Sequence, residues 1–161
     1  MKTLSLALFG LAVAALLGQQ PTTSPPPNGA AINPPWTSAQ VLTPADLAKQ
    51  LKNSDAKIIQ VGFANLYKVK HIPGSVYAGP GRSDAGLDEL KKAVAEVPKD
   101  RQIILYCGCC PWDHCPNMKP AFSLLRSLGY TKIKVMEIPT NFGADWVDKG
   151  YPIEGSAASP Q

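Results

Sequence analysis

The hydrophobic positions of this chain fall into short continuous runs, separated by longer amphipathic segments. Residues 57–61, 102–106 and 132–138 are apolar runs of the length that buried strands have, and residues 75–77 form a shorter one. Continuous apolar strands that alternate with helices are typical of a parallel sheet covered by helices on both faces. The pattern therefore predicts an α/β fold.

The segments between these runs have the periodicity of helices. Thr43 and Pro44 match the N-cap and the first position of one helix. Apolar residues at helical spacing predict a second helix over residues 87–97. A third is expected from Asn117, as its N-cap, to residue 128, and a short last helix over residues 142–149.

The two ends of the chain differ in composition from its middle. A short charged start and an uncharged apolar stretch, shorter than the roughly 20 residues that span a bilayer, predict a signal peptide over residues 1–18. An uncleaved membrane anchor is the alternative. Residues 19–40 are expected to form a proline-rich linker, residues 41–154 the folded domain and residues 155–161 a flexible tail. We therefore expect an exported protein, periplasmic or extracellular, that meets the membrane only transiently through its signal peptide.

Charge excludes one class of function. The net charge is +4 and the sequence has no run of lysines or arginines, so we expect no nucleic-acid partner. Hydrophobic residues make up 45% of the chain, which is sufficient for a globular core.

All four cysteines lie in one short segment: Cys107, Cys109, Cys110 and Cys115. Structural disulfides usually join distant parts of a chain, and pairs within one loop would cross-link very little of it. Outside the cytosol thiols tend to pair unless they are bound or used. Cys107 directly follows the run at 102–106, and parallel sheets bind ligands beyond the carboxyl ends of their strands. Both observations indicate that this loop carries the chemistry.

Three segments, in the same order, resemble the rhodanese-like family. They are H-I-P-G-S at residues 71–75, Tyr106-Cys107 at the end of a strand, and Trp146 followed by G-Y-P-I at residues 150–153. The resemblance covers roughly residues 42–154. It implies a small α/β domain around a parallel sheet, and transfer of sulfane sulfur through a persulfide on Cys107. It also implies a small sulfur donor, a thiol or cyanide acceptor, and no required cofactor.

The active-site loop departs from the family pattern. Family members often read D-x-R after the first strand, where this chain has Gln60, Val61 and Gly62. Their loop typically reads C-x-x-G-x-R-S, whereas here nine residues without an arginine, 108–116, separate Cys107 from the next helix. Backbone N–H groups near that helix, with Lys119 as a candidate cation, are expected to lower the pKa of Cys107 and to support an anion.

The loop has three interpretations. In the first, Cys107 carries the persulfide and a neighbouring thiol resolves it as a disulfide. In the second, the C-x-x-C spacing serves thiol–disulfide exchange, with Cys107–Cys110 or Cys110–Cys115 as pairs, because bonding of adjacent cysteines is strained. In the third, a soft ion, Cu(I) or Zn(II), binds to ligands drawn from Cys107, Cys109, Cys110, His114 and Cys115. The other loop residues considered are Gly108, Trp112, expected to cover the loop, and Asp113, expected to form a turn.

Overall fold

The computed structural model describes residues 34–156, and its strands form one parallel sheet. The strand order is β1-β5-β4-β2-β3, with β4 at the centre. This confirms the predicted α/β class. The strands are β1 (Val41–Leu42), β2 (Lys57–Gln60), β3 (Val76–Tyr77), β4 (Ile103–Tyr106) and β5 (Ile133–Met136).

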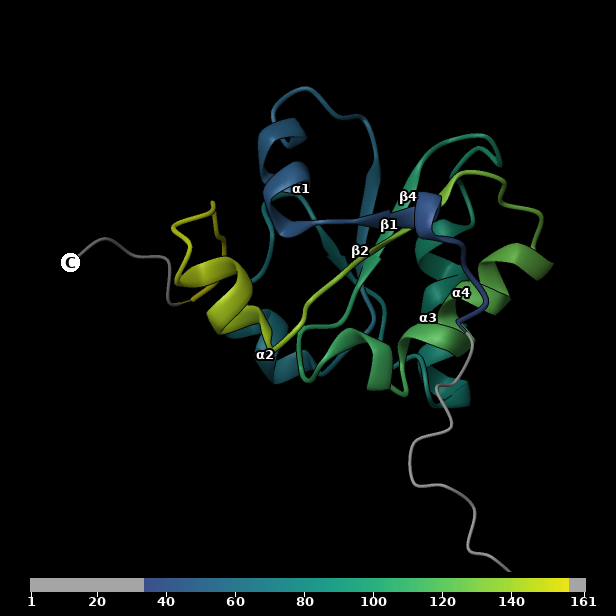
Figure 1. Cartoon of the computed structure of the whole chain (residues 1–161). Coiled ribbons are helices and arrows are strands. Elements are labelled where there is room, and N and C mark those ends of the chain that lie inside the picture. The colour runs from purple at the N-terminus through teal and green to yellow at the C-terminus, as the bar shows by residue number, and fades with distance from the viewer. Residues whose placement is uncertain (1–33, 157–161) are drawn as a thin grey trace, which may run out of the picture. The chain divides into compact units, whose positions relative to one another are not determined.

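Helices cover both faces of this sheet. Figure 1 shows α3 and α4 together on one face and α1 on the other. A π-helical turn, η3 (Gly143–Val147), lies with α1, because Trp146 belongs to the same apolar cluster as Leu47 of α1. The helices are α1 (Pro44–Gln50), α2 (Ala64–Val69), α3 (Asp84–Val94) and α4 (Met118–Ser127).

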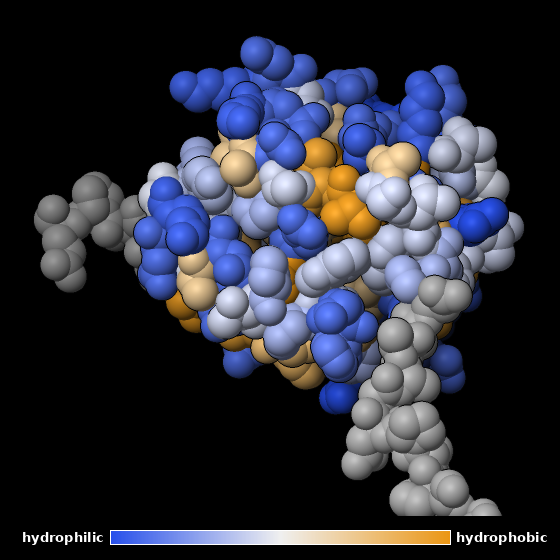
Figure 2. Space-filling model, in the orientation of Figure 1, coloured by the Kyte–Doolittle hydropathy of each residue, from blue (hydrophilic) through white to orange (hydrophobic). Residues whose placement is uncertain are grey.

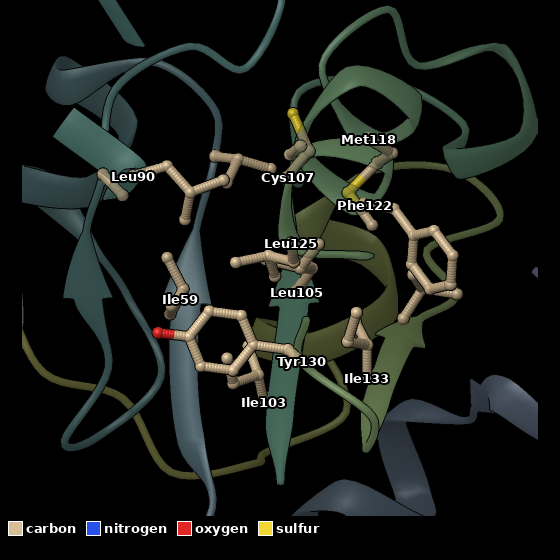
Figure 3. Packing of buried hydrophobic residues seen from close by; sticks show 14 of the residues in the cluster. Ile59, Leu90, Ile103, Leu105, Cys107, Met118, Phe122, Leu125, Tyr130 and Ile133 are labelled. Atoms are coloured by element: carbon tan, nitrogen blue, oxygen red, sulfur yellow. The ribbon is translucent and has the colours of Figure 1, made fainter. Parts of the chain in front are cut away.

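Alternation along the strands divides the core into two clusters. Ile103 and Leu105 of β4 pack with the residues of α3 and α4, whereas Ile104 and Tyr106 pack with those of α1 and η3. This follows from the period of two in a strand, which points successive side chains to opposite faces. Figure 3 shows the first cluster, with Leu125 and Tyr130 against Leu105 and Ile103. The central strand is buried on both faces, so the loop that follows it starts from a rigid position.

Local signals account for most helix boundaries. Thr43 caps α1 as expected, because its hydroxyl accepts a hydrogen bond from the backbone N–H of Asp46. The helix expected over residues 87–97 instead begins at Asp84, because Ser83 caps it by accepting from the Gly86 N–H. Gly129 ends α4 with a φ of +86°, a conformation that glycine adopts without strain.

The sequence pattern missed one strand and one α-helix and misjudged one cap. β1 and α2 were not expected, because two residues and six residues give too little periodicity to recognise. Asn117 precedes α4 as predicted, but its side chain makes no capping hydrogen bond. The Asn117 side chain hydrogen-bonds instead to Cys107 Sγ and to the Arg82 backbone N–H.

The folded domain extends beyond the predicted linker boundary at residue 40. Trp36 is only 6% exposed and belongs to the main core cluster, and residues 38–40 form a 3-10 turn. The linker assigned to residues 19–40 is therefore wrong over its last few residues. Burial of the large Trp36 ring stabilises the domain and holds this part of the chain against it. At the other end, the Ser156 N–H donates to the Lys68 carbonyl, so the predicted tail at 155–161 begins attached to the domain.

The predicted signal peptide, most of the linker and the rest of the tail lie outside the described residues. Within residues 34–156, no helix combines the length and the apolar character that a membrane crossing needs. The face seen in Figure 2 is mostly hydrophilic, and hydrophobic residues show there only in small areas.

Candidate active site

Cys107 lies where the parallel sheet predicts a functional residue. It directly follows β4 at the carboxyl edge, and Figure 3 shows its sulfur pointing away from Leu105 and Leu125. The neighbouring chain after β2 comes very close at Gly62. A Cβ there would lie 2.9 Å from the Cys107 carbonyl oxygen and 3.1 Å from Cys107 Sγ. The glycine that replaces the family's arginine therefore leaves room for the sulfur.

The four sulfur atoms form one cluster. Cys107 Sγ lies 3.1 Å from Cys109 Sγ, which in turn lies 3.4 Å from Cys110 Sγ. The Sγ atoms of Cys107, Cys109 and Cys115 all lie within 4.8 Å of one another. All four are free thiols, of which Cys107 and Cys115 are buried and the other two half-buried. The loop thus folds back on itself and brings Cys115 to the strand end.

Asn117 connects this cluster to the rest of the domain. Its side chain is fully buried, and its amide Nδ2 donates to Cys107 Sγ at 3.3 Å and approaches Cys109 Sγ at 3.9 Å. Its Oδ1 accepts from the Arg82 backbone N–H at 3.2 Å, which fixes the orientation of the amide. An N–H donor aimed at a sulfur stabilises negative charge on that sulfur.

The pKa values of the four thiols are shifted in different directions. Hydrogen bonds to Cys109 and Cys115, followed by burial, raise the pKa of Cys107 well above its usual value. Hydrogen bonding with the Cys107 thiol is the main reason why the pKa of Cys109 is lowered to about 5 and that of Cys115 to about 7. Burial is the main cause that raises the pKa of Cys110 to about 12. The expectation that the loop lowers the pKa of Cys107 itself is therefore wrong, because the more exposed Cys109 holds the negative charge.

A cavity opens onto this pair of sulfurs. It has a volume of about 530 Å³ and is lined by Cys107, Gly108 and Cys109 on one side. Cys107 is 3% exposed, so the cavity is its route to small molecules. The other lining residues include apolar Leu66, Val69, Phe142 and Val147 and polar Gln60 and Asn65.

The loop is anchored by backbone hydrogen bonds and aromatic packing. Gly108 has a φ of +84°, and a Cβ at that position would lie 2.8 Å from the Phe142 Cβ. Trp112 donates its backbone N–H to the Ile138 carbonyl, and its ring stacks on Trp36 with centroids 5.8 Å apart. Trp112 thus anchors the loop to the core through Trp36 and the chain after β5.

Several residues considered at the sequence level lie away from the sulfur cluster. The exposed His114 Nδ1 pairs with Asp113 at 2.9 Å, and neither belongs to the group of candidate ligands around Cys107. The Lys119 ammonium is buried, and within residues 34–156 it has no hydrogen-bond partner, so no direct contact links it to a thiolate. Arg82 places its guanidinium over the Phe63 ring, 5.6 Å from the centroid.

The residues of the two flanking motifs have structural roles. His71 Nδ1 donates to the Tyr67 carbonyl at 2.7 Å, and the imidazole stacks on the Tyr67 ring, which orders the turn as expected. Trp146 is fully buried and donates its indole N–H to the Pro152 carbonyl at 2.8 Å. Tyr151 packs edge-on against Trp146, which closes the second core cluster.

Sequence reasoning named Asn117 and Gly62 without assigning them to the site, although each carried a signal. Asn117 is a polar residue at a buried helix start, and Gly62 stands at the position of an arginine in the family pattern. Gln60 was noted only as a departure. It is 2% exposed, and its Nε2 donates to the Cys107 carbonyl at 3.4 Å.

Comparison with known proteins identifies the family of the chain. The model of the rhodanese-like domain family matches residues 43–137, which is more than half of the chain. No curated protein matches the chain. The family match includes β2, β4, the cysteine loop and α4.

Solved structures share the fold at low sequence identity. A Bacillus halodurans protein is 21% identical with a TM-score of 0.56, over 72% of this chain and 77% of its own. The rhodanese-like domain of an Anabaena protein is 22% identical with a TM-score of 0.55, over 76% of this chain and 83% of its own. A thiosulfate sulfurtransferase from Pseudomonas aeruginosa is 18% identical with a TM-score of 0.55, over 74% of this chain but 20% of its own.

These neighbours show the same fold, and the family match covers the strand end that carries the cysteine cluster. The chain belongs to the rhodanese-like domain family.

Proposed function

We propose that this protein is a sulfurtransferase that carries sulfane sulfur as a persulfide on Cys107. The observation that carries the proposal is the position of Cys107, at the end of β4 and on the cavity wall, with Cys109 Sγ 3.1 Å away. A thiosulfate sulfurtransferase has the same fold, which supports this reaction class.

In the first step the donor loads the protein. Cys107 Sγ forms a bond to the sulfane sulfur, and its proton passes along the existing hydrogen bond to the Cys109 thiolate. The S–S bond of the donor breaks, and the electron pair leaves with the rest of the donor. Cys109 therefore acts as the proton acceptor that a buried thiol with a raised pKa requires.

In the second step an acceptor removes the sulfur. A thiolate or cyanide attacks the outer sulfur, the bond from that sulfur to Cys107 Sγ breaks, and Cys107 recovers its electron pair and its proton. The sequence of two steps is redox-neutral, so it needs no cofactor. The Asn117 amide stabilises the charge that develops on Cys107 Sγ in both steps.

A disulfide offers a second exit from the persulfide. Cys109 attacks Cys107 Sγ, and sulfide leaves with the electron pair and the Cys109 proton, so that a Cys107–Cys109 disulfide remains. An external dithiol then reduces this disulfide and is itself oxidised. The 3.1 Å separation favours this pair over the Cys107–Cys110 and Cys110–Cys115 pairs expected from the spacing.

The loop chemistry favours an organic sulfur donor over thiosulfate. The loop has no arginine to bind two anionic charges, and the charged residues of the cavity lining, Lys70 and Asp148, are of opposite sign. The cavity is also lined in part by apolar Leu66, Val69 and Phe142. A small organic persulfide places an apolar group against these residues while its terminal sulfur reaches Cys107.

We also propose that the reaction takes place in the periplasm or outside the cell. The proposal rests on the signal-peptide pattern of residues 1–18. Cell fractionation with an antibody against the domain tests it: recovery of the mature chain in the exported fraction is expected, and recovery in the cytosol would refute it.

Substitution of Cys107 tests the proposed function directly. We expect Cys107→Ser to lower sulfur transfer from an organic persulfide to cyanide by at least about 1,000-fold, because it removes the atom that forms the bond. Cys110→Ser, which removes a thiol from the same loop, should retain at least ten times the activity of Cys107→Ser. Equal activity of Cys107→Ser and the unsubstituted protein would refute the proposal.

A further inference from the structure

We infer that Cys107, Cys109 and Cys115 also form a binding site for one Cu(I) ion. Their three Sγ atoms lie within 4.8 Å of one another, and they come from both ends of the loop. Metal–thiolate bonds of about 2.3 Å place three sulfurs around a trigonal ion about 4 Å apart. The loop therefore already holds its sulfurs near the spacing that a trigonal thiolate site needs.

The number and kind of ligands favour Cu(I). Structural zinc sites take four ligands, whereas the group here offers three. Cys110 Sγ contacts Cys109 Sγ and hydrogen-bonds to the Cys115 thiol, but it lies outside the group of three sulfurs, and the exposed His114 is paired with Asp113. No carboxylate belongs to this group of side chains, so hard cations find no oxygen ligand there. Three soft thiolates without a fourth ligand suit monovalent copper.

Hydrogen-bond donors surround the sulfurs as a second layer. Asn117 Nδ2 donates to Cys107 Sγ at 3.3 Å, and the Asn117 backbone N–H donates toward Cys115. The Cys109 backbone N–H donates toward Cys107. Three thiolates and one Cu(I) ion carry a net charge of −2, and N–H donors at the sulfurs offset part of it. Asn117 precedes α4 directly, and the N-terminus of this helix also favours negative charge.

The exposure of the three cysteines provides an entry path. Cys109 is half-buried on the wall of the 530 Å³ cavity, so it can meet an incoming ion first. Cys107 and Cys115 are each 3% exposed and would shield the bound ion from water. Such an arrangement suits capture and release by ligand exchange through Cys109.

This site uses the same sulfurs as the proposed sulfur transfer but does not depend on that reaction. Binding exchanges thiol protons for Cu(I) and changes no oxidation state. Since Cys107 cannot hold both a copper ion and a sulfane sulfur, the copper-loaded protein should be inactive in sulfur transfer. A chelator that removes copper should restore the activity.

Competition with a coloured Cu(I) chelator under anaerobic conditions tests the site in the full chain. We expect the protein to withdraw one equivalent of Cu(I). Cys107→Ser, Cys109→Ser and Cys115→Ser should each weaken binding by at least about 100-fold, above the 10–100-fold typical of second-layer residues. Cys110→Ser and His114→Ala should change affinity by less than about threefold, because neither side chain belongs to the group.

Several results would overturn the site. These are failure to withdraw copper, a stoichiometry other than one, tighter binding of Zn(II) than of Cu(I), or loss of binding in Cys110→Ser. Circular dichroism checks that each variant folds. If a buried-cysteine variant unfolds, the half-buried Cys109→Ser decides the question alone. The assay contains no sulfur donor, so its failure is distinct from failure of the proposed sulfurtransferase activity, which is measured with chelator present.

Discussion

Replacement of Asn117 by alanine separates two roles of its side chain, one in sulfur transfer and one in the stability of the domain. The side chain is fully buried, and the oxygen and the nitrogen of its amide make hydrogen bonds with different functions. Oδ1 accepts from the Arg82 backbone N–H at 3.2 Å and holds the chain after β3 against the start of α4. Nδ2 donates to Cys107 Sγ at 3.3 Å, where charge develops during sulfur transfer.

Loss of the two hydrogen bonds predicts one effect on the free energy of unfolding and another on kcat. Loss of the Oδ1 acceptor leaves a partly buried N–H without its partner, which costs about 1–3 kcal/mol of the free energy of unfolding. For a domain of this size this lowers Tm by roughly 4 °C per kcal/mol. A hydrogen bond to a charged group contributes about 1.5–3 kcal/mol. Because 1.36 kcal/mol corresponds to a factor of ten in rate, kcat for sulfur transfer should fall by about 10–150-fold.

The assay measures kcat with an organic persulfide and cyanide at a temperature well below the Tm of the variant, so that all of the protein is folded. Asn53→Ala is the matched control, because Asn53 is an exposed asparagine on the surface. It should change neither Tm nor kcat. A kcat of Asn117→Ala within twofold of the unsubstituted protein would refute the role assigned to the amide, whatever its Tm.

Three further predictions concern access, protonation and packing. Gly62→Ala should lower the rate of Cys107 alkylation at least tenfold, since the new Cβ would lie 3.1 Å from the sulfur; an unchanged rate in peptide mapping would contradict this. Cys109 alkylation should already be near its plateau at about pH 6, because its pKa is lowered to about 5, whereas alkylation of Cys110, whose pKa is raised to about 12, should keep rising with pH. Equal pH profiles would disprove the charge distribution. Trp36→Ala should cost about 3–5 kcal/mol in chemical denaturation, because the ring is buried in the main core, and a loss below 1 kcal/mol would place it outside the domain.

The sheet and its central strand follow from local sequence patterns. Residues 102–106 are continuously apolar, and β4 is buried on both faces, as such a run predicts. The same reasoning places Cys107 at the carboxyl edge without any knowledge of tertiary structure. β1 and α2 escaped prediction because their short lengths carry no clear period, and their pairing depends on residues far along the chain.

The details of the site depend on contacts that spacing does not specify. The sequence predicts a cluster of thiols but not which sulfurs meet: the loop brings Cys115 back to Cys107 and leaves His114 in solvent. The direction of the Cys107 pKa also depends on this contact, since its thiol donates to neighbouring sulfurs. Asn117 looked like a helix cap because the pattern of helix starts is local, whereas its actual partners are ten and thirty-five residues away.

The position of the sulfane sulfur tests the central claim most directly. The full chain is loaded with an organic persulfide, its thiols are blocked without reductant, and proteolytic peptides that separate the cysteines by fragmentation are weighed by mass spectrometry. The account predicts one added sulfur atom on Cys107 and its removal by cyanide. Added sulfur on Cys109, Cys110 or Cys115 but not on Cys107, or neither added sulfur nor a Cys107–Cys109 disulfide in the loaded protein, would contradict it.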